Sequence, residues 1–371
     1  MNLRHRLNLA FTLFALASLT LFARADAAPL PRSPCLTPEQ VDALAGEIRA
    51  STVLCGGVYR PLVITNSDIL LDCAGECVIL ADYEIGVRAQ NVDRVSIANL
   101  TIRTITPRAQ EIGSLGALNI ASACGVFRGV GVSLIDAIGA TVDHVKIVYL
   151  NDGPFAGVVG VDICGGGEHE IINSDLSHTT GWGVRVVASD RNRIYRNVMR
   201  ENVRADGSAN ESANILIVGS WAAGKGADEN VVYANVLEHG GDGVYINGFD
   251  FPTSNRNLVI GNTITRSIAN CLEGTGNPTP GTSGTNIFLN NTIAGCGEHL
   301  GWITHTVDTV FCGNGKGAVD ARASIGALVD ASAECTLLAA IQAKGLPTTP
   351  PPLKNAPPAL PRATNEPELT R

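Results

Sequence analysis

Four side chains capable of acid–base chemistry stand at equivalent positions of a repeated pattern in the middle of the chain. Each follows the anchor residue of one repeat, a serine or an asparagine, by four positions. If the repeats stack, neighbouring members lie about 5 Å apart, where an imidazole, a carboxylate and a guanidinium influence one another's ionisation. We call this set the turn column: His178, Glu201, His239 and Arg266.

A second polar set belongs to the strand that follows each of these turns. Arg185, Tyr245 and Glu273 are predicted to point outward, and Asp242 stands just before its strand. Together the two sets offer arginine to neutralise a uronate carboxylate, histidine or tyrosine to remove the C5 proton, and an acid for the leaving oxygen. The alternative is that these are ordinary polar turn residues, because solvated turns collect such residues without function. The predicted catalytic residues are His178, Glu201, His239, Arg266, Arg185, Asp242, Tyr245 and Glu273.

Metal ligands are harder to find in this sequence. Asp152 and Asp162 could bind calcium with backbone carbonyls, but no acidic loop has a recognisable calcium spacing. The prediction is therefore no cofactor, with calcium as an open possibility. The remaining histidines lack comparable companions and are interpreted as surface or turn residues: His144, His169, His299 and His305.

An internal repeat predicts where the candidate catalytic residues lie in the fold. Each repeat carries short runs of β-branched residues around its anchor, and the intervals between successive anchors are 23, 38, 27 and 29 residues. Three short strands and three turns within one such interval make one coil of a parallel β-helix. The Leu-x-x-Leu-x-Leu-x-x-Asn pattern of leucine-rich repeats is absent, and the aromatic residues are too few for the blades of a β-propeller, so both folds are disfavoured. The anchors are Ser174, Asn197, Asn235, Asn262 and Asn291.

The predicted fold is all-β, a right-handed single-stranded parallel β-helix with an N-terminal capping helix and a short C-terminal helix. The anchor asparagines are expected to turn inward and hydrogen-bond the neighbouring coil, as in an amide ladder. Thr37, Pro38 and Gln40 give the start of a capping helix over residues 37–50. The second helix is expected at residues 333–344. The β-helix itself is placed at residues 54–316, after an N-terminal segment at 26–53 and before a C-terminal cap at 317–345.

The two ends of the chain differ from its middle. Arg4 and Arg6 precede an apolar run and small residues, a pattern typical of a secretory signal peptide over residues 1–25. A membrane anchor is the alternative, but the run is short and interrupted by polar residues. Residues 346–371 are rich in proline and predicted to be a disordered tail. The mature protein is therefore expected to be secreted or periplasmic, without a membrane span.

Composition limits the kinds of binding partner and indicates the redox environment of the protein. The net charge of −8 makes nucleic acid a poor partner, because phosphate binding needs clustered cations. Ten cysteines in an oxidising compartment indicate disulfides, and we predict that Cys271 pairs with Cys296 and Cys312 with Cys335. A zinc site is the alternative, and only the spacing of Cys73 and Cys77 approaches one.

A family resemblance appears in the same residues. The run from Ile69 to Gly75 and the repeated Gly-Val and Asn-x-Ile units resemble the right-handed β-helix, pectate-lyase-like superfamily of secreted bacterial proteins. That superfamily includes polysaccharide lyases, glycoside hydrolases, epimerases, tailspikes, adhesins and a copper-site maturation factor, so the resemblance implies a fold rather than one function. The lyase motifs Trp-Ile-Asp-His and Arg-x-Pro-x-x-Arg and the hydrolase motifs Asn-Thr-Asp and Gly-His-Gly are absent from this sequence.

Three functions therefore remain open. The first is an enzyme acting on an extracellular or periplasmic polysaccharide by elimination, hydrolysis or epimerisation. The second is a non-catalytic carbohydrate-binding or adhesion protein, for which the discriminating feature is the aromatic group Trp182, Trp221, Tyr245, Phe249 and Phe251. A periplasmic metal-site assembly factor comes last, because two methionines and oxidised cysteines are poor copper ligands.

Overall fold

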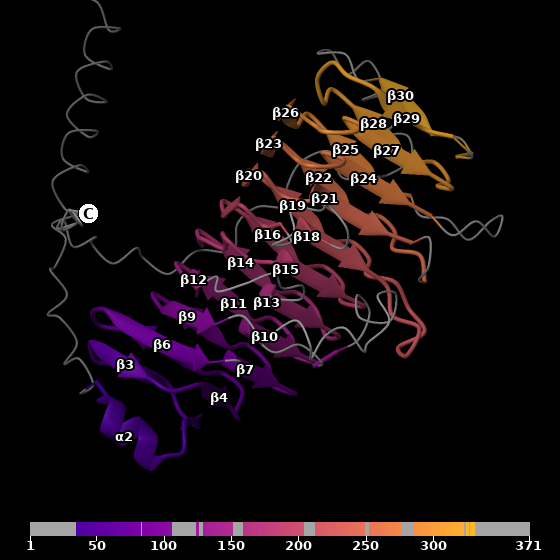
Figure 1. Cartoon of the computed structure of the whole chain (residues 1–371). Helices are drawn as coiled ribbons and strands as arrows, with labels where there is room; N and C mark the ends of the chain where they lie inside the picture. Colours follow the sequence, from indigo (N-terminus) through magenta and orange to yellow (C-terminus); the bar gives the residue numbers. More distant parts are fainter. Residues whose placement is uncertain are drawn as a thin grey trace, which may run out of the picture. The chain divides into compact units, whose positions relative to one another are not determined.

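The computed structural model describes residues 35–82, 84–105, 124–125, 129–150, 159–203, 212–248, 252–276, 285–322, 324–325 and 327–330. The chain forms two units, Met1–Cys35 and Leu36–Arg371. The architecture below is that of the second unit, which is built almost entirely of short parallel strands (Figure 1). The predicted signal peptide, the helix at 333–344 and the tail at 346–371 lie outside the described residues.

Three parallel sheets run along this unit. Most coils contribute one strand to each sheet, so a strand pairs with strands of the coils before and after it rather than with its neighbours in sequence. This is the predicted right-handed parallel β-helix. Sheet 1 contains β1 (Glu47–Ile48), β4 (Leu62–Ile64), β7 (Ile85–Gln90), β10 (Val130–Ile135), β13 (Val159–Cys164), β15 (Trp182–Val187), β18 (Ala213–Val218), β21 (Asp242–Asn247), β24 (Leu272–Thr275), β27 (Gly301–Thr304) and β29 (Val319–Asp320).

Sheet 2 has the same number of strands, and sheet 3 is divided into two groups of four. Sheet 2 contains β2 (Thr52–Leu54), β5 (Leu70–Cys73), β8 (Ser96–Ala98), β11 (Thr141–Asp143), β14 (Glu170–Ile172), β16 (Arg193–Tyr195), β19 (Val231–Tyr233), β22 (Leu258–Ile260), β25 (Ile287–Leu289), β28 (Val310–Cys312) and β30 (Leu328–Asp330). Sheet 3 contains β3 (Gly57–Tyr59), β6 (Cys77–Asp82), β9 (Thr101–Ile105) and β12 (Lys146–Leu150), then β17 (Val198–Arg200), β20 (Val236–Glu238), β23 (Thr263–Thr265) and β26 (Thr292–Ala294).

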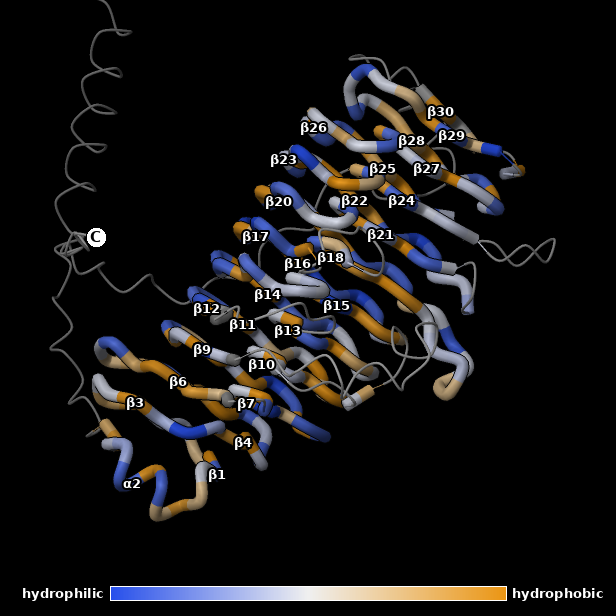
Figure 2. Tube along the Cα trace, viewed as in Figure 1, coloured by the Kyte–Doolittle hydropathy of each residue, from blue (hydrophilic) through white to orange (hydrophobic). Residues whose placement is uncertain are grey.

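The core lies between the three sheets and consists of aliphatic ladders. Val161, Val184, Ile215 and Val244 are register partners on successive strands of sheet 1, and all four are fully buried. Alternation along each strand sends such residues inward, which produces the short apolar bands of Figure 2. Burial of each side chain contributes about 1.5–3 kcal/mol. Stacked coils therefore share one continuous core.

The predicted amide ladder is present between sheets 2 and 3. In the anchor ladder, the side-chain oxygen of Asn235 accepts the backbone N–H and the side-chain amide of Asn197 at 3.0 and 3.1 Å. Its own amide donates to Ile194 O and Asn262 Oδ1 at 2.8 and 2.9 Å. The same pattern continues to Asn291 and Asn314. Buried polar groups are thus satisfied along the whole row, as a low-dielectric interior requires.

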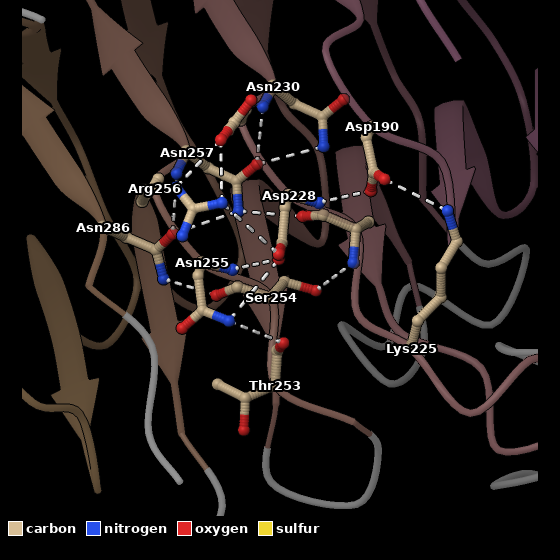
Figure 3. A network of polar contacts seen from close by, with 12 residues as sticks. Asp190, Lys225, Asp228, Asn230, Thr253, Ser254, Asn255, Arg256, Asn257 and Asn286 are labelled. Atoms are coloured by element: carbon tan, nitrogen blue, oxygen red, sulfur yellow. Dashed lines mark hydrogen bonds and ion pairs between the residues drawn. The ribbon is translucent and has the colours of Figure 1, made fainter. Parts of the chain in front are cut away.

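A second ladder, which the sequence reasoning missed, follows the turns from sheet 1 to sheet 2. It joins His169, Asn192, Asn230, Asn257 and Asn286, and Figure 3 labels the last three of these. Beside it, Asp190 accepts the backbone N–H of Asp228 at 2.9 Å, and Asp228 accepts that of Asn255 at 2.7 Å. Lys225 pairs with Asp190 at 3.1 Å. These carboxylates therefore hold consecutive turns in register.

His169 corrects the interpretation of this residue as a surface or turn histidine. It is fully buried, and its Nδ1 accepts the backbone N–H of Ala140 at 3.0 Å, as an asparagine oxygen does elsewhere in the ladder. Burial lowers the pKa of His169 to about 4, against a smaller opposing contribution from a backbone hydrogen bond with Ala137. The imidazole is therefore neutral at ordinary pH.

The N-terminal helix is shorter than predicted. α2 spans Pro38–Ala43, and its capping box is present, with Thr37 N–H donating to the Gln40 side chain at 2.9 Å. The helix ends at Leu44, and Ala45 and Gly46 both have positive φ. This reversal lets residues 47 and 48 join sheet 1 as β1, so the predicted second half of the helix at 37–50 is wrong. In the part of the unit that is described, no helix is long and apolar enough to span a membrane.

Disulfides are present along the unit. The predicted Cys271–Cys296 bond is confirmed, and Cys73–Cys77 and Cys124–Cys164 are further bonds. The pair that came closest to zinc spacing is therefore oxidised. Cys312 is also disulfide-bonded, and its predicted partner at position 335 lies outside the described residues.

Candidate active site

The turn column occupies the register that the repeats predicted. His178, Glu201, His239 and Arg266 all have positive φ, an uncommon conformation for non-glycine residues. Glu201, His239 and Arg266 each follow a strand of sheet 3, directly before the turn into sheet 1. Backbone hydrogen bonds run from each member's N–H to a carbonyl of the next coil. The left-handed turn is therefore repeated on successive coils.

The side chains of the turn column form a surface ion-pair network. His239 Nδ1 lies 2.5 Å from Glu201 Oε2, with the two side chains 38% and 41% exposed. Arg266 pairs with Glu238 instead of contacting His239, and Glu238 also binds Arg200 at 2.9 Å. Exposed pairs of this kind contribute up to about 1 kcal/mol each. His178 is exposed.

Arg185 lies apart from the turn column, inside the protein. Its guanidinium forms a two-point contact with Asp162 on the adjacent strand, at 2.8 and 3.1 Å, and both side chains are fully buried. The same guanidinium lies 5.8 Å from the ring centre of Trp182. Both charges of this pair are already neutralised, which leaves Asp162 poorly suited to hold calcium. Asp152 lies outside the described residues.

The remaining predicted residues come together on the outer face of sheet 1, where two columns run side by side. The first contains Asp242, Asn270 and His299 on three successive coils. The second contains Tyr245, Glu273, Trp302 and Asp320, each the register partner of the next. Neighbours within a column are about 4.8 Å apart along the backbone. We call Asp242, Tyr245, Asn270, Glu273, His299 and Trp302 the sheet-1 site.

Asn270 connects the two carboxyl groups of the sheet-1 site. Its backbone N–H donates to Asp242 Oδ1 at 2.9 Å, and its side-chain amide donates to Glu273 Oε2 at 2.8 Å. Its side-chain oxygen then faces His299 Nδ1 at 3.1 Å, so this imidazole nitrogen carries a hydrogen and donates it. One residue, Asn270, thus forms hydrogen bonds with two acids and a histidine.

Burial makes both carboxyl groups weaker acids than usual. Asp242 is 7% exposed and Glu273 is 4% exposed. Loss of solvation raises the pKa of Asp242 to about 7, which the hydrogen bond from Asn270 opposes and the charge of Glu298 assists. Burial, with the charge of Asp242, raises the pKa of Glu273 well above its ordinary value. Near neutral pH the pair therefore holds at least one proton, so it can donate one proton and accept another.

The pair lies just below the protein surface. His299 and Trp302 are half-buried, and Glu298 is exposed. Tyr245, also half-buried, hydrogen-bonds Glu273 from the preceding coil. Of the aromatic group considered for carbohydrate binding, Trp182 is buried, Trp221 is 61% exposed, and residues 249 and 251 lie outside the described part. An acid flanked by tyrosine and tryptophan is the arrangement that can hold a sugar ring against a proton donor.

Sequence reasoning missed Asn270, His299 and Trp302. A signal for them was present, because they stand 28 or 29 residues after Asp242, Asn270 and Glu273, one coil further along. Among the described residues no cluster of three metal-ligating side chains occurs.

Comparison with known proteins supports the fold. No family model matches the sequence, and no curated protein matches it. Among solved structures, an alginate lyase AlyF-OU02 in complex with G6 is 14% identical, with a TM-score of 0.50, covering 84% of this chain and 64% of that one. An alginate lyase from Paenibacillus sp. str. FPU-7 is also 14% identical, with a TM-score of 0.49, 79% coverage of this chain and 93% of that one.

A tailspike protein, Dettilon, is a further structural neighbour at 13% identity, with a TM-score of 0.42, covering 78% of this chain and 63% of that one. At these identities the likeness concerns the β-helix alone, and the same fold carries different activities. The chemistry must therefore be argued from the side chains of the sheet-1 site.

Proposed function

We propose that this protein is a secreted or periplasmic enzyme that hydrolyses a polysaccharide at the sheet-1 site. The observation that carries the proposal is the buried pair of Asp242 and Glu273, joined through Asn270. Glycoside hydrolysis needs one carboxylic acid and one carboxylate on the same glycosidic bond. The disulfides of the β-helix agree with an oxidising compartment.

The two carboxyls take different roles in the proposed reaction. Asp242, whose pKa burial raises to about 7, supplies the carboxylate near neutral pH. Its carboxylate removes a proton from water as the water oxygen attacks the anomeric carbon. Glu273, whose pKa is raised well above its ordinary value by burial and by the charge of Asp242, donates its proton to the departing glycosidic oxygen. The bond from the anomeric carbon to that oxygen breaks, and one new reducing end forms.

The other residues of the site position the reactants. Asn270 fixes both carboxyls, and its contact with His299 fixes the orientation of the amide. Trp302 lies beside Glu273 in the register of sheet 1, where its ring can stack on a sugar face. Tyr245 occupies the opposite side of Glu273. A sugar ring bound at this site would therefore contact two aromatic residues that lie on either side of the acid.

The ion pairs of the two predicted catalytic arginines favour hydrolysis over β-elimination. Elimination from a uronate requires a positive group to neutralise the substrate carboxylate. Arg185 is bound to Asp162 in the protein interior, and Arg266 is bound to Glu238 at the surface. One structural neighbour with this fold is an alginate lyase, so elimination is the reaction to be distinguished experimentally.

The test is a panel of polysaccharides incubated with the purified mature protein. Reducing ends and absorbance of unsaturated sugars are recorded together, because hydrolysis produces the first without the second. We expect reducing ends from at least one substrate, and loss of this activity in Asp242→Asn. An exposed carboxyl on the same β-helix supplies the control, Glu76→Gln. Unsaturated products overturn hydrolysis, and binding without any product supports the non-catalytic carbohydrate-binding function.

A further inference from the structure

The surroundings of the carboxyl pair carry an inference about substrate charge. We propose that the sheet-1 site takes uncharged sugar units and discriminates against uronates. The inference rests on the hydrolytic function proposed above, and it concerns a property that the fold itself does not determine. Its basis is the distribution of charged side chains on the three coils around Asp242 and Glu273.

Additional acidic residues border the pair on the side of later coils. Glu298 directly precedes His299, and its backbone N–H donates to Ala269 O of the coil that carries Asn270 and Glu273, at 3.0 Å. Its negative charge acts on both Asp242 and Glu273. Asp320 follows Trp302 in the register of sheet 1. Asp320 is itself paired with Arg322, so a carboxylate substrate entering here meets chiefly the negative charge of Glu298.

Three arginines on the described coils around the site are already matched with carboxylates. Arg322 binds Asp320 through its Nε at 2.8 and 2.9 Å and through Nη2, at an exposed position. Arg266, on the turn before Asn270, binds Glu238. The guanidinium of Arg185 lies two strands before Tyr245 in sheet 1 and is bound to Asp162. Recruiting any of these arginines to a uronate separates an existing ion pair.

A uronate also interferes with the chemistry of the pair. An additional negative charge within a few ångströms disfavours ionisation of neighbouring carboxyls. Asp242 then keeps its proton at neutral pH, so the carboxylate that activates water is lost. An uncharged sugar leaves Asp242 free to ionise and Glu273 protonated. The site therefore selects against uronates both in binding and in the rate of reaction.

The experiment compares matched substrates that differ only in charge. The panel contains neutral glucans, mannans, galactans and xylans, together with polygalacturonate and alginate and the carboxyl-reduced form of each polyuronate. Hydrolysis is measured as reducing ends and binding by affinity electrophoresis, for the parent protein, Glu298→Gln and the control Glu76→Gln. We expect kcat/KM at least about tenfold higher on neutral or carboxyl-reduced polymers, with a smaller preference in Glu298→Gln and an unchanged one in the control.

The outcomes separate this inference from the proposed function. Hydrolysis of a polyuronate as fast as its carboxyl-reduced form overturns the charge selectivity and leaves the hydrolase intact. Binding of neutral polymers without hydrolysis overturns the hydrolase and leaves the selectivity intact. Tighter binding of polyuronates with no reducing ends, or no binding at all, overturns both. Equal preference in the parent and Glu298→Gln removes Glu298 as the source of the selectivity and overturns the electrostatic argument.

Discussion

Replacing Asp242 by asparagine should change how the stability of the protein depends on pH. Asp242 has a pKa of about 7 in the folded protein and an ordinary value of 3.8. Between these values the folded state binds more protons than the unfolded state, so its stability falls as pH rises from about 4 to about 7. Three pKa units correspond to about 4 kcal/mol. The variant lacks this contribution, while its amide oxygen can still accept the Asn270 N–H.

The measurement is equilibrium unfolding in denaturant, with the disulfides intact, at several pH values from 4 to 8. The slope against pH is compared rather than absolute stability, because burying an asparagine amide has a cost that does not depend on pH. We expect the variant to lose roughly 4 kcal/mol less than the parent over this range. The control Glu76→Gln should follow the parent. Curves for parent and Asp242→Asn that run parallel to within about 1 kcal/mol would refute the electrostatic description of the site.

Three further predictions concern the β-helix. Asn235→Leu removes the partners of the buried Asn197 N–H and Ile194 carbonyl and should lower the free energy of unfolding by about 2–6 kcal/mol, measured by denaturant unfolding; a loss below 1 kcal/mol speaks against the ladder. Burial lowers the pKa of His169 from 6.5 to about 4, so the free energy of unfolding should decrease by about 3 kcal/mol as the pH is lowered between these two values. His169→Asn should abolish this decrease. An unchanged pH dependence in the variant argues against burial of His169. Val244→Asp places an unpaired carboxyl in the core and should cost several kcal/mol or prevent secretion, so unchanged melting would disprove the register.

The fold was largely predictable because its information is local and repeated. Each coil carries the same sequence of β-branched residues and an anchor, so a single repeat unit defines the strands, the turns and the ladder of Asn197, Asn235 and Asn262. The end of α2 was less predictable. The amphipathic spacing of a helix extends to Ile48, but Glu47 and Ile48 form β1 and pair with β4 instead of continuing the helix. The second ladder was not predicted, because only the anchor asparagines were expected to turn inward.

The site was predictable in part. The outward register of Tyr245 and Glu273 follows from strand alternation, and both are found side by side on adjacent coils. Burial does not follow from alternation, so the repeat pattern did not indicate that Arg185 is fully buried against Asp162 while His239 remains on the surface. The role of Asn270 depends on hydrogen bonds to Asp242 and His299, which lie on two different coils. Such contacts between coils become visible only in three dimensions.

The most direct test of the central claim compares the hydrolytic rates of Glu273→Gln and His239→Ala on the substrate that the parent cleaves. If Glu273 donates the proton, its glutamine variant should lose turnover by about two to four orders of magnitude, with melting no lower than that of the parent. His239, half-exposed and paired with Glu201, should be replaceable with little change in rate. Full activity in Glu273→Gln together with loss of activity in His239→Ala would contradict the account and move the active site to the turn column.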